Sequence, residues 1–105
     1  MNQITPQELK AQLDRHEPIV LVDVRQDWET KLCRLKNAIH IPIEEIEYRV
    51  EELNPDDEIV VYCRVGERSA AVAHYLTQLG FKNVKNLLGG VDSWAQSVDP
   101  AMRRY

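Results

Sequence analysis

The fold is decided by one stretch of the chain, which reads Ile59-Val60-Val61-Tyr62-Cys63-Arg64-Val65-Gly66-Glu67-Arg68-Ser69-Ala70-Ala71. Its first four residues are apolar and rich in β-branched side chains, which predicts a buried strand over 59–62. A compact loop with one glycine and two arginines follows. The alanine-rich segment after it predicts a helix from about Glu67 to Leu79, with Gly80 as its stop.

Cys63 is the candidate catalytic residue, because of where this pattern places it. It lies at the carboxyl end of a strand, where open α/β sheets bind their ligands. It also faces the amino end of a helix, whose unpaired N–H groups and dipole favour an anion. A thiol in such surroundings has its pKa lowered from about 8.5 toward about 7 and becomes a nucleophile. The loop therefore predicts a site for an anionic sulfur.

Strands and helices alternate along the rest of the chain. A capping box with proline at the first helical position, Thr5-Pro6-Gln7-Glu8, predicts a first helix that ends near His16. Besides 59–62, apolar runs predict strands over 19–24, 38–41 and 84–88, and helical segments are expected over 28–32, 46–53 and 91–96. This alternation predicts an α/β fold with a mainly parallel sheet and helices on both faces.

Composition indicates one small domain covering residues 1–105. The formal net charge of -4 argues against nucleic acid or an anionic membrane as a partner, because phosphate contacts need a basic surface. No run of about 18 apolar residues predicts a membrane helix. Two cysteines and a start without signal-peptide features indicate a reducing, cytoplasmic location.

Metal and cofactor chemistry is not expected. No C-x-x-C motif or Cys/His cluster has metal-ligand spacing, and the three histidines are scattered at positions 16, 40 and 74. Cys33 is interpreted as a structural thiol, and Trp94 as a core anchor. Three charged residues near the first long strand are interpreted as a structural network below the site: Asp23, Arg25 and Glu29.

Four segments resemble motifs of the rhodanese family of sulfurtransferases. They are Cys63-Arg64-Val65-Gly66-Glu67-Arg68, Leu21-Val22-Asp23-Val24-Arg25 with Glu29, Ala38-Ile39-His40-Ile41-Pro42, and Leu88-Gly89-Gly90-Val91-Asp92-Ser93-Trp94. The chain departs from the family's G-H-I-x-G-A pattern, because it reads Cys33-Arg34-Leu35-Lys36-Asn37-Ala38. Asn tolerates a positive φ, so the backbone is expected to be kept there. The resemblance implies a rhodanese-like fold with a five-stranded sheet.

The resemblance also implies the function, which is transfer of sulfur as a persulfide on Cys63. The loop residues Arg64, Val65, Gly66, Glu67, Arg68 and Ser69 would bind the sulfur through their backbone N–H groups. The two arginines would attract a small anionic donor such as thiosulfate and lower the thiol pKa. Cyanide in vitro, a thiol or a sulfur-carrier protein would accept the sulfur. The last motif and the residues after it also resemble rhodanese domains fused to E1-like adenylyltransferases, which favours a protein acceptor.

Three alternatives remain open at this stage. Arg64 and Arg68 could form a solvated charge pair with Glu67 instead of binding an anion. Cysteine phosphatases also place Cys and Arg around an anion, but with the signature C-x5-R. Only four residues separate Cys63 from Arg68, which favours a sulfurtransferase over a phosphatase or an arsenate reductase. A non-catalytic rhodanese module for protein binding is the third alternative, and the loop cysteine counts against it.

Overall fold

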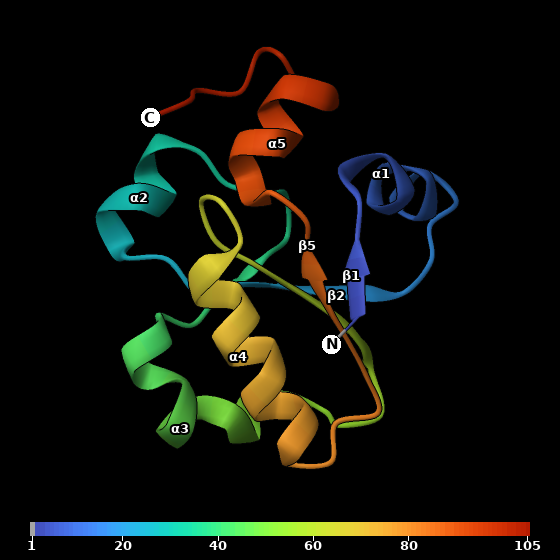
Figure 1. Cartoon of the computed structure of the whole chain (residues 1–105), viewed down its shortest axis with the longest axis vertical. Coiled ribbons are helices and arrows are strands. Elements are labelled where there is room, and N and C mark those ends of the chain that lie inside the picture. The colour runs from blue at the N-terminus through green and yellow to red at the C-terminus, as the bar shows by residue number, and fades with distance from the viewer. Residues whose placement is uncertain (1) are drawn as a thin grey trace.

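Five parallel strands form one sheet in a computed structural model that describes residues 2–105 (Figure 1). The strands are β1 (Asn2–Ile4), β2 (Ile19–Asp23), β3 (Ile39–His40), β4 (Glu58–Tyr62) and β5 (Asn83–Leu87). Their order is β1-β5-β4-β2-β3, and every neighbouring pair runs parallel. The strand before Cys63 is therefore in the middle of the sheet. The predicted α/β class and the parallel sheet are confirmed.

The helices are α1 (Pro6–Asp14), α2 (Asp27–Leu32), α3 (Ile46–Arg49), α4 (Glu67–Gln78) and α5 (Gly90–Ser97). The predicted capping box of α1 is present, since Thr5 Oγ1 accepts from the Glu8 N–H and Glu8 Oε1 from the Thr5 N–H. The prediction of one continuous helix over 46–53 is wrong. Two 3₁₀ turns, Ile43–Glu45 and Val50–Glu52, flank a single turn of α-helix, as is common at helix ends.

Each face of the sheet is buried under its own helices. Successive residues of a strand point to opposite faces, so Ile59 and Val61 of β4 pack with side chains of α3 and α4. Val60 and Tyr62 pack on the other face with side chains of α1 and α5. α1 and α5 lie side by side there, as Figure 1 shows. Helices on both faces are therefore confirmed.

The fifth strand implied by the family resemblance is β1, which is not among the four strands that the apolar runs predict. Its residues pair with β5, Ile4 lying opposite Leu87. Ile4 also belongs to the same apolar cluster as Leu9 of α1, so it contributes to both the sheet and the start of α1. Within residues 2–105, no helix has the length and apolar character needed to span a membrane.

Candidate active site

The loop between β4 and α4 places Cys63 as the sequence predicts. Cys63 directly follows β4 and its side chain is almost completely buried, with 1% exposed. Gly66 is the N-cap of α4 and has a φ of 103°, a left-handed conformation that glycine adopts without steric cost. The chain therefore turns sharply between strand and helix, and α4 begins three residues beyond Arg64, at Glu67.

Three donors surround the sulfur of Cys63. The Gly66 N–H lies 3.1 Å from Sγ, the Ser69 N–H 3.5 Å, and the Ser69 hydroxyl oxygen 3.3 Å. Gly66 and Ser69 belong to the cap and first turn of α4, so their N–H groups have no partner within the helix. The positive end of the helix dipole is directed at the same atom. This arrangement can stabilise a negative charge on sulfur.

The pKa of the Cys63 thiol reflects two opposing effects. Burial raises the pKa, because it disfavours the charged thiolate. The hydrogen bonds from the Ser69 side chain and from the N–H groups of Ser69, Gly66 and Val65 act against burial and together outweigh it. The net result is a thiol pKa below its usual value, in the direction expected from the sequence.

The start of α5 holds the other side of the loop. The Val91 N–H donates to the Cys63 carbonyl and the Asp92 N–H to the Arg64 carbonyl, both at 3.0 Å. A Cβ atom on Gly90, whose φ is +60°, would collide with both carbonyl groups. Glycine is therefore required at position 90 for the close approach of the two backbones. The Gly89-Gly90 motif thus has a direct physical role in shaping the loop.

Arg68 is bound by a residue distant in the sequence. Its Nη1 and Nη2 lie 2.6 and 2.9 Å from the two carboxylate oxygens of Glu29, in a bidentate ion pair. The Tyr105 hydroxyl donates to Glu29 Oε2 at 2.7 Å. Glu29, which sequence analysis placed in a network below the site, is thus connected directly to the loop. The alternative pairing of Arg68 with Glu67 is replaced by this one.

Arg64, Val65 and Glu67 lie at the exposed rim of the loop. The Arg64 guanidinium carbon lies 5.1 Å from the centre of the Tyr105 ring, a cation–π contact. Tyr105 also packs edge-on against Trp28, which brings the C-terminal end next to α2 (Figure 1). Both loop arginines are therefore held by other side chains, and the direct contacts to Sγ come from backbone and Ser69.

We expect the Glu29–Arg68 ion pair to make the free energy of unfolding depend on pH. Hydrogen bonds from Arg68 lower the pKa of Glu29 to about 2, against the opposing effect of burial. A carboxylate whose pKa is lowered by folding stabilises the native state above its unfolded pKa. Between about pH 5 and pH 2, wild type should therefore lose about 2–3 kcal/mol of unfolding free energy through this group. Urea unfolding across this pH range measures the loss.

The control for this prediction is a matched pair of Glu-to-Gln variants. Glu29→Gln has no carboxylate to protonate, so its profile should be flatter than that of wild type. Glu47→Gln changes an exposed residue of α3 in the same way and should follow the wild-type profile. Equal slopes in all three proteins would show that the ion pair contributes nothing to the acid dependence.

The second charged pair of the network lies deeper. Arg25 and Asp23 are both buried, and Arg25 Nη2 lies 2.7 Å from Asp23 Oδ2. Arg25 also donates to the Cys33 carbonyl at 2.6 Å and to the Tyr105 hydroxyl at 2.9 Å. These bonds join β2, the end of α2 and the C-terminal segment. The predicted structural role of this pair agrees with its position.

The segment that departs from the family pattern keeps its turn. Asn37 has a φ of 64°, so it takes the left-handed conformation that was expected of it. Arg34 Nη2 donates to the Ala38 carbonyl at 2.9 Å and spans the same turn. Cys33 is partly buried, and its Sγ lies 3.6 Å from Arg25 Nη1. Arg34 and Cys33 therefore contact backbone and network atoms.

Comparison with known proteins agrees with this geometry. The model of the family described as "Rhodanese-like domain" matches residues 5–97. The chain belongs to the rhodanese-like family. A sulfurtransferase of Allochromatium vinosum is 35% identical over 96 residues, covering 91% of this chain and 90% of the relative. A rhodanese-like domain protein from Staphylococcus aureus has a TM-score of 0.87 and 33% identity, with 100% and 99% of the two chains covered.

A longer relative adds one more fact. The "Putative sulfur carrier protein YrkF" of Bacillus subtilis is 35% identical over 92 residues, which cover 88% of this chain and 50% of that protein. The rhodanese-like chain therefore spans about half of that relative. Together, the family and its named members support sulfur transfer as the general chemistry of this protein.

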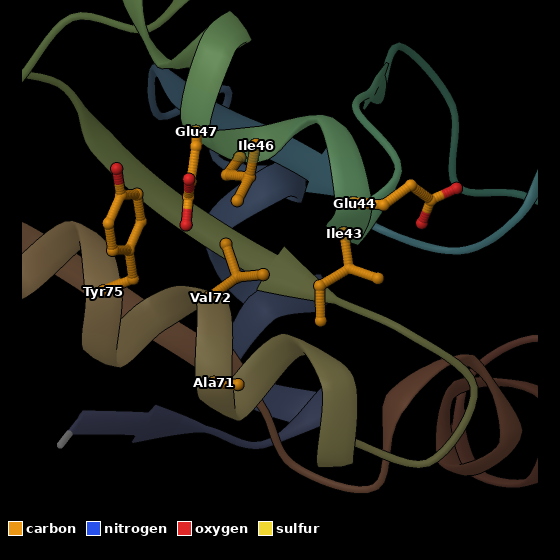
Figure 2. Close-up of a pocket in the computed structure, with 7 residues that line it drawn as sticks. All are labelled: Ile43, Glu44, Ile46, Glu47, Ala71, Val72 and Tyr75. Atoms are coloured by element: carbon orange, nitrogen blue, oxygen red, sulfur yellow. The ribbon is translucent and has the colours of Figure 1, made fainter.

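A groove in this rhodanese-like domain lies away from Cys63. It has a volume of about 370 Å³ and lies between the Ile43–Arg49 segment and α4 (Figure 2). Its lining residues are Ile43, Glu44, Ile46, Glu47, Ala71, Val72 and Tyr75, with Glu47 and Tyr75 toward one end and Glu44 at the other. Neither Cys63 nor any other residue of the loop between β4 and α4 lines this groove.

Two residues at the site were missed by sequence reasoning. Tyr105 lies beyond the last predicted helix, and it contacts Arg25, Glu29 and Arg64. Asn86 is a buried amide on β5, and its side chain contacts both Ser69 and Gly66. The available signal for Asn86 was its alternation with apolar Val84 and Leu88 along the predicted strand, because a polar side chain on a buried face is rare without a partner.

Proposed function

We propose that this protein is a sulfurtransferase in which Cys63 is the nucleophile and carries the transferred sulfur as a persulfide. The observation that carries the proposal is the set of three donors directed at one buried sulfur atom, from Gly66 and Ser69. Such donors stabilise both a thiolate and the anionic end of a persulfide. The family membership and the relatives named sulfurtransferases support the same chemistry.

The proposed reaction has two steps. With thiosulfate as donor, the Cys63 thiolate attacks the outer sulfur and forms a new S–S bond. The bond between the outer sulfur and the sulfonate sulfur breaks, and sulfite leaves with the electron pair. In the second step a nucleophilic acceptor attacks the terminal sulfur of the persulfide, and the Cys63 thiolate leaves. No net oxidation is required, because the sulfane sulfur is passed from one nucleophile to another.

Backbone groups would do most of the anion binding in this mechanism. Arg68 is neutralised by Glu29, and Arg64 contacts the Tyr105 ring. The Arg64 charge lies at the exposed rim of the loop, where it adds to the field that an approaching anion meets. The N–H groups of Gly66 and Ser69 contact the sulfur itself. Arg64 is therefore proposed to attract the donor, Arg68 to position the loop through Glu29, and the backbone to hold the sulfur.

The proposed physiological acceptor is a thiol or a sulfur-carrier protein. The Bacillus subtilis relative named as a putative sulfur carrier supports this direction. Cys63 is buried, whereas the loop residues Arg64 and Val65 are exposed. An acceptor would therefore have to approach the rim of the loop with a slender nucleophilic group. A small thiol, or a nucleophile at an extended chain terminus of a carrier protein, meets this requirement.

Incubation with thiosulfate tests the proposal. We expect the intact mass to increase by one sulfur atom, and dithiothreitol to remove it, because a thiol accepts the terminal sulfur. Peptide mapping should place the sulfur on Cys63. Cys33→Ser should gain the same mass, since Cys33 contacts network atoms rather than the loop donors. A sulfur found on Cys33, or no added sulfur at all, would contradict the proposal and favour a non-catalytic binding module.

The spacing of the loop disfavours the phosphatase alternative. Four residues separate Cys63 from Arg68, and the donors from Gly66 and Ser69 converge on one atom. A phosphoryl group needs donors spread around three oxygens. We expect no hydrolysis of aryl phosphates by wild type. Phosphatase activity that disappears in Cys63→Ser would overturn the sulfurtransferase proposal.

A further inference from the structure

The hydroxyl group of Ser69 lies between two hydrogen-bond acceptors. Its oxygen is 3.3 Å from Cys63 Sγ and 2.5 Å from Asn86 Oδ1. A serine hydroxyl has one hydrogen to donate and can also accept. It can therefore donate to the sulfur or to the amide oxygen, but not to both at full strength.

The orientation of the Asn86 amide is fixed by its other end. Asn86 Nδ2 donates to the Gly66 carbonyl at 3.1 Å. Turning the amide over would bring its oxygen against that carbonyl oxygen, and two acceptors would face each other. Oδ1 is therefore directed at Ser69, where an amide oxygen can only accept. Asn86 Oδ1 is thus held where it can accept the hydroxyl hydrogen of Ser69.

Water is poorly placed to relieve this competition. Ser69 is 0% exposed, Asn86 2% and Cys63 1%. When Cys63 is a thiol, Ser69 can donate to Asn86 while its oxygen accepts the S–H hydrogen. When Cys63 is a thiolate, the hydroxyl must turn toward the sulfur, and Asn86 Oδ1 loses its donor. A buried acceptor without a donor is unfavourable, so the thiolate is opposed by Asn86.

Most charged side chains around the loop contact other groups, so they do not compete for the hydroxyl hydrogen of Ser69. Arg68 pairs with Glu29, Arg64 contacts Tyr105, and Asp92 at the start of α5 pairs with Arg104. On the sheet side, Lys85 next to Asn86 pairs with Glu58 of β4. Exposed Glu67 begins α4. In residues 2–105, no charged side chain forms a hydrogen bond with Sγ, Ser69 Oγ or the Asn86 amide.

We propose that Asn86 is a positioning residue that competes with Cys63 Sγ for the single hydroxyl hydrogen of Ser69, and so limits how far the loop donors stabilise the thiolate. This inference rests on the proposed role of Cys63 as the nucleophile. Asn86 acts through Ser69 and does not touch the sulfur. It has a second, separate contact, which holds the Gly66 carbonyl and thereby the loop.

A double-mutant cycle separates these two contacts. Asn86→Leu removes the contacts of Asn86 with Ser69 and with the Gly66 carbonyl. The substitution is introduced into wild type and into Ser69→Ala, which has no hydroxyl hydrogen for which Asn86 and Cys63 could compete. The readout is the thiol pKa of Cys63, from the pH dependence of iodoacetamide alkylation in a Cys33→Ser background. Asn83→Leu, at the start of the same strand, is the matched control.

When Ser69 is present, Asn86→Leu should lower the pKa of the Cys63 thiol more than it does in the Ser69→Ala background. The expected difference between the two effects is about 0.5–1 pKa unit, a threefold to tenfold change in the ionisation constant. Asn83→Leu should show no such coupling. An equal effect of Asn86→Leu in both backgrounds, or a coupling of opposite sign, would overturn the proposal. Asn86→Asp retains an acceptor oxygen facing Ser69 and should not make the thiol more acidic; acidification would also overturn it.

An infrared measurement tests the same proposal if Asn86→Leu does not fold. The S–H stretch of Cys63, assigned by its loss in Cys63→Ser, should move in Ser69→Ala because the thiol no longer donates to the hydroxyl oxygen. An unmoved band would overturn the proposal. Neither readout involves sulfur transfer. A protein that shows the coupling but takes no sulfur from thiosulfate would refute the proposed function alone.

Discussion

Replacing Cys63 with serine is expected to reduce thiosulfate:cyanide sulfur transfer by at least about a thousandfold, because no other group can form the persulfide. The sulfur accepts from Gly66 and from Ser69, and a hydroxyl at the same place would keep the loop folded. An alcohol is not ionised by these donors near neutral pH, since its intrinsic pKa is far above that of a thiol. Steady-state rates with purified protein measure the loss.

Cys33→Ser is the matched control for this loss. Cys33 packs against the apolar cluster under α1 and α5, and its carbonyl rather than its thiol makes the short contact to Arg25. The variant should therefore keep most of the wild-type rate. Comparable losses in the two variants would mean that both thiols are needed, and the single-cysteine mechanism would be wrong. Circular dichroism of both variants separates a chemical loss from unfolding.

The local part of the site could be predicted from the sequence because neighbouring residues determine it. A β-branched run, one glycine and an alanine-rich segment predict a strand, a tight turn and a helix, and all three are present. The position of Cys63 then follows from the chain itself. Asn37, too, took the conformation that its residue type favours. These features depend on short stretches, where propensity and backbone geometry act directly.

The missed features depend on contacts between distant residues. β1 has three residues and is defined by its pairing with β5, more than 80 positions away along the chain. The partners of Arg68 and Ser69 are Glu29 and Asn86, which come from other elements. A sequence pattern identifies which residues are polar, but it does not say which of them meet. Glu67 is the acidic residue nearest to Arg68 in the sequence, but in the folded protein Arg68 pairs with Glu29.

The buried pair Asp23–Arg25 provides the largest stability effect that we expect. Arg25 is the bulkiest completely buried side chain among residues 2–105, and Asp23 is its only carboxylate partner there. Burial disfavours the charged guanidinium, but hydrogen bonds and the charge of Asp23 more than offset this, and the pKa of Arg25 is raised. The cation is therefore retained inside the protein. Its other oxygen partners, the carbonyl groups of Glu29 and Cys33 and the Tyr105 hydroxyl, carry no charge.

Asp23→Ala should therefore lower the free energy of unfolding by about 3–5 kcal/mol, because it leaves a buried charge without its counter-charge. Urea unfolding at neutral pH measures the change. Asp27→Ala breaks the exposed pair with Lys31, whose side chains are 73% and 75% exposed, and should cost less than about 0.5 kcal/mol. Replacing both members of the buried pair, Asp23→Leu with Arg25→Met, should destabilise less than Asp23→Ala does, since no unpaired charge remains. If Asp23→Ala were as mild as Asp27→Ala, water would have to reach Arg25, and the network would not be the buried structural element that joins β2, α2 and the C-terminal segment.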